Sequence, residues 1–288
     1  MRIFLLLRRQ DVKRDSLKLI QNVEKSREVD SPLFQHIQSV QPYILPEEEY
    51  FQLINELAEK EEVIFALVES AKRSMAENNF SEAVKFWKKA SEKVEKDSYF
   101  IQQLALCTYK SELPSEKIAL QDALGIISSL EPDGRTTNDP ETLGITGAIY
   151  KRLWLLDNNE LEYIERAIKY YNKGFAINSD YYTGENYALC LDLKGNFIED
   201  EDEKTYCRLE AKKTREKIIE IIEIFKEDED FLIRSDLKWI YATLSNCYLA
   251  LNNKELHRKY EELFFSNSPA DWETKTYEVS KQQILSLM

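Results

Sequence analysis

The sequence predicts an all-α fold, a right-handed superhelical stack of antiparallel helix pairs. One observation is the spacing of Ala167, Tyr171 and Gly174, which stand at offsets 0, 4 and 7 in a helical segment. Residues with this spacing share one stripe of a helix, where the small residues admit a neighbouring helix and the aromatic ring fills the space beside them. The other observation is that the 288 residues include only seven glycines and seven prolines, so turns are few and helices long. The same offsets recur at Ala83, Trp87 and Ala90, at Leu120, Leu124 and Ile127, and at Leu256, Tyr260 and Leu263.

The first 45 residues predict a helix followed by an extended connector. Between residues 11 and 27, apolar residues recur at three- and four-residue steps, which is the helical period. Pro32, Pro42 and Pro46 then break the pattern, because proline disfavours a helical conformation in the residue before it. We therefore predict two parts, residues 1–45 and a helical repeat domain at residues 46–288.

From residue 46 onward, helical segments are expected in pairs. Pro46 and three glutamates open the first helix, since proline fits a first turn and acids favour the positive end of the helix dipole. Ser81 is the expected N-cap of the second helix. The expected segments are 46–77 and 81–95, 98–110 and 115–130, 140–156 and 161–177, 187–193 and 204–226, 235–251 and 254–266, and a final capping helix from Pro269.

Such helix pairs are typical of tetratricopeptide repeats, whose units stack on one another. In the segment 182–188, Gly184 is expected to supply a backbone geometry that other residues resist. Asn186 is expected to hydrogen-bond nearby main chain. The residues expected to pack the repeats are Ala83, Trp87, Ala90, Gly147, Tyr150, Ala167, Tyr171, Gly174, Gly184 and Asn186.

Composition argues against several classes of function. A net charge of −13 repels phosphate backbones, so no nucleic-acid partner is expected. The apolar run near the start spans only five residues before two arginines, which fits neither a signal peptide nor a membrane span. Four unpaired cysteines indicate buried thiols in a reducing cytoplasm, and two distant histidines make a metal site or a Cys–His nucleophile improbable. We therefore expect a cytoplasmic protein without cofactor or membrane, and not an enzyme.

Three motifs in order resemble a known family. They read DPETLGITGAIYK at 139–151, AIKYYNKGF at 167–175 and YTGENYA at 182–188. The chain looks like the TRAFs-binding, tetratricopeptide-like region of apoptosis signal-regulating kinases and of many bacterial proteins. The resemblance extends from about residue 62 to the end.

Longer bacterial relatives carry an N-terminal α/β domain, similar to nucleoside 2-deoxyribosyltransferase or TIR domains, before a DSPLFQ-like junction. The chain has DSPLFQ at 30–35. The resemblance thus implies that residues 1–45 are the remnant of such a junction and that the rest is the family's C-terminal part. No catalytic glutamate or phosphate-binding turn precedes Asp11, so the activity of those relatives does not carry over.

The favoured function is a non-catalytic interaction scaffold. Repeat solenoids offer a concave groove lined by the first helix of each pair, here 61–77, 98–110 and 140–156, which would hold a peptide or helix of a partner protein. The candidate groove residues are Lys72, Arg73 and Arg152. Such a scaffold would suit a role in bacterial signalling or defence.

Two alternatives stay open. In the first, the chain is the regulatory part of a larger deoxyribosyltransferase-like or TIR-like enzyme. In the second, it is one part of a split protein, and its apolar start, Ile3 to Leu7, invites self-association into a homo-oligomer.

Overall fold

A computed structural model describes residues 47–94, 96–158 and 160–288 of the protein. The chain divides into two compact units, residues 1–61 and residues 62–288, and the second of these carries the features discussed below. The expected helix at 11–27, the connector at 30–46 and the junction motif lie outside the described residues. The division at residue 45/46 stays a prediction.

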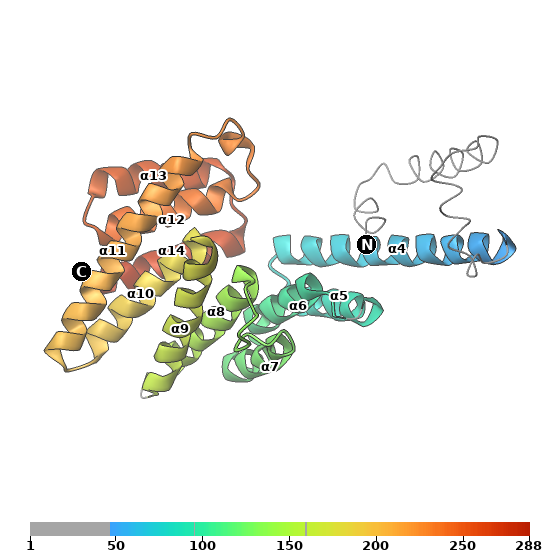
Figure 1. Ribbon diagram of the computed structural model, residues 1–288, viewed down its shortest axis with the longest axis horizontal. Helices are drawn as coiled ribbons and strands as arrows, with labels where there is room; N and C mark the ends of the chain where they lie inside the picture. Colours follow the sequence, from blue (N-terminus) through green and yellow to red (C-terminus); the bar gives the residue numbers. More distant parts are fainter. Residues whose placement is uncertain (1–46, 95, 159) are drawn as a thin grey trace, which may run out of the picture. The chain divides into compact units, whose positions relative to one another are not determined.

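The described residues form eleven α-helices and one short 3₁₀ helix, and contain no strand (Figure 1). The elements are α4 (Glu47–Ala76), α5 (Phe80–Lys93), α6 (Ser98–Ser111), α7 (Glu116–Ser128), α8 (Pro140–Leu156), α9 (Leu161–Asn178), α10 (Tyr181–Phe197), α11 (Glu201–Phe225), η1 (Phe231–Ile233), α12 (Leu237–Ala250), α13 (Lys254–Ser266) and α14 (Asp271–Ser286).

Neighbours in sequence are neighbours in space. The helices pack as the pairs α6/α7, α8/α9, α10/α11 and α12/α13, while α5 packs on α6 and shares an apolar cluster with α4 (Figure 1). The first helix of each pair also contacts the first helix of the next, through α6–α8, α8–α10 and α10–α12. Each second helix contacts the first helix that follows it. The expected all-α superhelical stack of antiparallel pairs is therefore confirmed.

In two of the stripes, the aromatic residue lies between small residues in the core. Ala83, Trp87 and Ala90 are completely buried, and so is Tyr171. A Cβ atom added to Gly147 on α8 would lie 3.0 Å from ring atoms of Tyr171 on α9. The two helices thus approach closely because one of them lacks a side chain at the contact.

Helix α10 begins six residues earlier than expected. The sequence predicts a helix from residue 187, yet the Asp180 carboxylate accepts a hydrogen bond from the amide of Thr183 at 2.7 Å and caps a helix that begins at Tyr181. Gly184 is therefore helical, and among the described residues no glycine has a positive φ, so the expected special backbone geometry is wrong. Asn186 does donate to main chain, to the carbonyl of Tyr182 at 2.9 Å.

A smaller difference concerns the first pair. The N-cap of α5 is Asn79 and not Ser81, because the Asn79 side chain accepts from the amide of Glu82 at 3.2 Å. Helix α4 is continuous through Lys60, as the expected segment 46–77 is. The difference shifts the start of α5 and leaves the pairing unchanged.

All four thiols are buried, which predicts that they react slowly in the folded protein. Burial raises the pKa of Cys107 and of Cys190 to about 12, and it raises the pKa of Cys207 and Cys247 as well. Because the thiolate is the reactive form, we expect no reaction with a disulfide reagent such as dithiobis(nitrobenzoic acid) near neutral pH until the chain unfolds. Four equivalents should then react in denaturant.

A matched control introduces a thiol at the surface. Val279 on α14 is 46% exposed, so the variant Val279→Cys should release one equivalent of chromophore within minutes in the native state. A native wild-type chain that reacts as fast as this variant would contradict the buried placement of the four cysteines.

Candidate partner-binding surface

We define the inner face as the surface formed by the first helices α6, α8, α10 and α12. Solenoids use the corresponding surface to bind partners. Here much of it is covered. Every residue is buried from Thr142 to Lys151 on α8, from Thr183 to Leu191 on α10 and from Ile240 to Cys247 on α12. Because a run of more than two turns presents all sides of a helix, these helices are covered all round.

The C-terminal helix α14 contributes to this cover. It packs against α12, and its Ile284 belongs to the same apolar cluster as residues of α6, α8 and α10. The Glu273 carboxylate accepts from Lys238 of α12 at 2.7 Å, and Thr276 accepts from Lys110 of α6 at 2.8 Å. The sequence indicates a capping helix at this position but gives no sign that it reaches back to α6.

A buried hydrogen-bond network fixes the middle of α14. The Ser245 hydroxyl lies 2.9 Å from Nδ1 of His257 and 2.8 Å from the hydroxyl of Tyr277. Tyr277 also donates to Glu261 at 2.8 Å, and Glu261 in turn pairs with Lys281 at 2.6 Å. Serine, histidine and glutamate lie near one another as in a hydrolase triad. Ser245 is completely buried and its hydroxyl already bonds Tyr277, so the network holds α14 and presents no nucleophile to solvent.

A second polar cluster lies in the interior between α8 and α12. Lys151 donates to Asn186 at 2.7 Å, and Arg215 pairs with Asp192 at 2.6 Å. Burial lowers the pKa of Lys151. Among the residues that the structure describes, the Nε and Nη2 atoms of Arg215 have no hydrogen-bond partner, although the side chain is only 4% exposed. Buried charges of this kind are costly unless they are paired, so this cluster is sensitive to the loss of one member.

The three predicted groove residues lie on two helices, and their joint role in partner binding stays a prediction. Lys72 and Arg73 are exposed on α4, and Lys72 pairs with Glu69 of its own helix at 3.4 Å. Arg152 is half-buried on α8, with its guanidinium 5.2 Å from the ring centre of Tyr109 on α6. Arg152 thus belongs to the inner face, where it joins two first helices, whereas Lys72 and Arg73 lie two pairs earlier in the chain.

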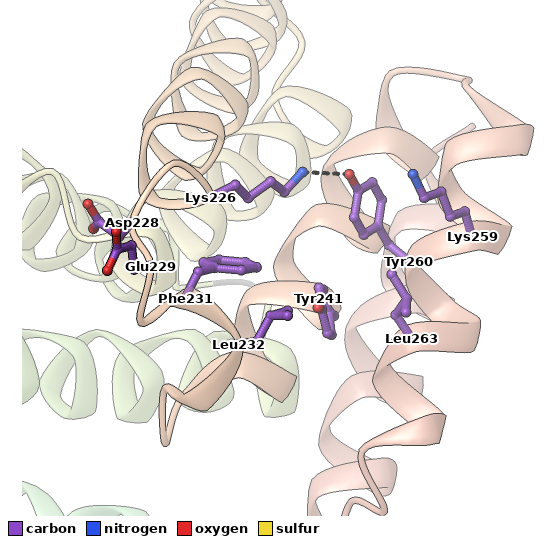
Figure 2. A pocket seen from close by; sticks show the side chains of 9 residues that line it. All are labelled: Lys226, Asp228, Glu229, Phe231, Leu232, Tyr241, Lys259, Tyr260 and Leu263. Atoms are coloured by element: carbon purple, nitrogen blue, oxygen red, sulfur yellow. Dashed lines mark hydrogen bonds between the residues drawn. The ribbon is translucent and has the colours of Figure 1, made fainter.

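A shallow hollow of about 400 Å³ lies at the end of α11, beside η1 and α13 (Figure 2). Lys226 donates to the Tyr260 hydroxyl at 2.6 Å, and Lys259 lies 5.4 Å from the same ring. Asp228 and Glu229 point away from the hollow, while Phe231 lies towards its centre (Figure 2). The exposed Leu232 at its rim adds apolar surface, and no motif in the sequence indicates this hollow.

The described residues offer no arrangement for a metal ion, since no group of three or more histidine, cysteine, aspartate or glutamate side chains gathers in them. Within the same residues, no helix has both the length and the apolar character needed to cross a membrane.

Comparison with known proteins supports the repeat assignment. The family model described as Tetratricopeptide Repeats-Sensor matches residues 79–191. The fold is similar to the crystal structure of TTC0263, a thermophilic TPR protein of Thermus thermophilus, with a TM-score of 0.51 and 15% identity over 76% of this chain and 99% of that one. No curated protein matches the chain. These comparisons support a tetratricopeptide-like helical repeat fold for the chain, and such folds in general mediate protein–protein interaction.

Proposed function

We propose that this protein is a non-catalytic interaction scaffold whose inner face binds a helical segment of a partner protein. The observation that supports this most directly is that the inner face already holds a helix, α14, through side chains of α6 and α12. A surface that accepts one amphipathic helix has the shape and the hydrogen-bonding groups to accept another. Arg152 beside Tyr109 adds a cation and an aromatic ring, both common in binding hot spots.

We further propose a regulatory role in bacterial signalling or defence, in the cytoplasm. The likeness of the motifs at 139–151, 167–175 and 182–188 to the TRAFs-binding region of apoptosis signal-regulating kinases supports this role. Four free thiols fit a reducing compartment, and a net charge of −13 disfavours nucleic acid as the partner. The alternative is that these helices regulate a deoxyribosyltransferase-like or TIR-like enzyme domain. An intact mass of the native protein larger than that of these 288 residues would favour that alternative.

Charge reversal at the predicted groove residues tests the scaffold. The tagged chain is purified from its native cells, and partner helices are mapped by cross-linking. For the variant Arg152→Glu we expect recovery of the cross-linked partner to fall about tenfold, because a buried interface charge pair is worth on the order of 1.4 kcal/mol or more. Lys72→Glu and Arg73→Glu test whether the surface extends to α4.

The control is Lys217→Glu on the second helix α11. Lys217 is matched to Lys72, since each is more than half exposed and pairs with a glutamate three residues away on its own helix. Recovery should be unchanged in this control. Full recovery with Arg152→Glu, or cross-links that fall mainly on the second helices, would refute partner binding at the inner face.

A further inference from the structure

Helix α14 reaches much further along the stack than a terminal cap requires. Its body packs on the last pair, where Tyr277 bonds Ser245 of α12 and Glu261 of α13. Its first turn contacts the beginning of the stack, because Trp272 joins the apolar cluster of α4, α5 and α6. A cap that only shields the last repeat would contact that repeat alone. Helix α14 therefore links elements that are separated by two helix pairs in the chain.

Trp272 occupies a slot made by three side chains from three helices. Its ring centre lies 6.0 Å from that of Phe80 on α5, edge to face, and 6.0 Å from that of Trp239 on α12. The Lys110 side-chain nitrogen of α6 lies 4.8 Å from the Trp272 ring and 5.9 Å from the Phe80 ring, and burial lowers the pKa of Lys110 to about 7. Aromatic pairs, together with the protonated form of Lys110 over the ring, favour an indole in such a slot. The slot thus selects an aromatic side chain at the start of a bound helix.

The rest of α14 is held by polar contacts and by buried apolar surface. The residues that face the stack, Glu273, Tyr277, Lys281 and Ile284, follow at steps of four, four and three, which is one helical stripe. Only Glu273, Tyr277 and Ile284 of this helix are buried. The acid binds Lys238, the phenol binds Ser245, and the lysine binds Glu261. Tyr277 and Ile284 also bury apolar surface, in two different apolar clusters, so a helix that replaces α14 must bury equivalent side chains.

The fit of α14 is also incomplete. The Oε1 atom of Gln283 is buried, and within the described residues it has no hydrogen-bond partner. An unsatisfied buried acceptor costs about 1–3 kcal/mol. A helix with the same stripe and a better residue at that position would bind the inner face more tightly than α14 does.

We infer that α14 is an exchangeable occupant of the inner face, and that the partner is an amphipathic helix of the same chemistry. Such a helix has a leading tryptophan for the slot, then an acid, a tyrosine, a base and an aliphatic residue at steps of four, four and three. This inference rests on the proposed scaffold function and names the partner class. When α14 occupies the inner face, the protein is in a closed state. The partner helix binds the inner face when α14 dissociates from it.

A peptide supplied in trans tests the exchange in the full-length chain. The probe is a fluorescein-labelled peptide with the sequence of residues 269–288, and binding is followed by anisotropy. In the wild-type chain α14 competes at the high effective concentration of a tethered segment, on the order of millimolar. In the variant Trp272→Ala the tethered helix binds less well, so we expect the peptide to bind at least about tenfold more tightly to the variant than to the wild type.

Two controls define the specificity. The chain variant Val279→Ala alters the solvent-facing side of α14, with Val279 46% exposed, and should bind the peptide as weakly as the wild type does. A peptide with alanine in place of both Trp272 and Tyr277 should bind neither chain. Circular dichroism verifies that each variant keeps its helical content.

A second measurement needs no variant. Hydrogen exchange of the wild-type chain with excess isotope-labelled peptide should speed up at the amides of residues 271–286, because those residues leave the stack when the peptide enters. Equal peptide affinity in wild type and Trp272→Ala, with unchanged exchange in α14, would overturn the inference. If Arg152→Glu still abolishes partner recovery in that case, the scaffold function stands and only the exchange of α14 fails.

Discussion

Replacement of Asp192 by alanine is expected to lower the free energy of unfolding by about 3 kcal/mol. Asp192 pairs with the Nη1 atom of Arg215 at 2.6 Å, and the Arg215 side chain is only 4% exposed. The variant removes the acceptor that pairs with this buried guanidinium, whose Nε and Nη2 atoms already have no partner among the described residues, and only the charge of the buried Glu185 still acts on it. Water reaches the site poorly, so most of the desolvation penalty remains.

The reverse deletion should cost less. In Arg215→Met the cation disappears, and the remaining Asp192 side chain is 21% exposed, so water can hydrate it. We expect a loss of about 1–2 kcal/mol. Urea unfolding followed by circular dichroism measures both values, provided that the dependence on denaturant is the same for each variant. Equal losses of unfolding free energy in the two variants would show that removing Asp192 does not leave a costly buried cation.

The double variant Asp192→Leu with Arg215→Met completes the comparison. Replacing a buried ion pair by apolar residues of similar volume is often neutral or stabilising. The double variant should therefore be more stable than Asp192→Ala alone. A double variant as unstable as the sum of the two single changes would mean that shape, and not charge, sets the cost at this site.

The second large effect is expected at Gly174, on α9. A Cβ atom there would lie 2.8 Å from Cγ2, 3.1 Å from Cβ and 3.1 Å from Oγ1 of Thr183 on α10. Rotation of the Thr183 side chain gives no relief, because its Cβ and both branches surround the position. Gly174→Ala thus forces α9 and α10 apart, and overpacking of this kind costs about 1–3 kcal/mol. Alanine returns about 1 kcal/mol through its helix propensity, so we expect a net loss of up to about 2 kcal/mol.

Gly125 on α7 provides the matched control. It is also helical, and a Cβ atom there would meet nothing within 4 Å. Gly125→Ala should therefore leave stability unchanged or raise it by up to about 1 kcal/mol. The same chemical change is expected to have opposite signs at two helical glycines. Thermal or urea unfolding of the pair checks this, and a stabilising effect at Gly174 would contradict the close approach of α9 and α10.

Local signals in the sequence were sufficient for most of the helices. Pro140 with its Asp139 cap and the break after Leu156 place α8 without reference to any neighbour, because caps and helix-period apolar residues act within a few residues. Because these signals are local, the sequence also predicts a start of α10 that is too late. Tyr181 to Gly184 has the composition of a turn, and the Asp180 cap together with burial of this segment against α9 outweighs that preference.

The sequence by itself determined the fold class and the pairing of the helices, since both follow from the helical period, the small–aromatic–small stripes and the short connections. Only the tertiary structure decided what covers the inner face. Contacts join Trp272 with Phe80 and Lys110, and Tyr277 with Ser245, which are far apart in the chain. Such contacts depend on how the pitch of the whole stack returns α14 towards α5 and α6. That pitch is the sum of many small packing angles, which no local pattern of residues records.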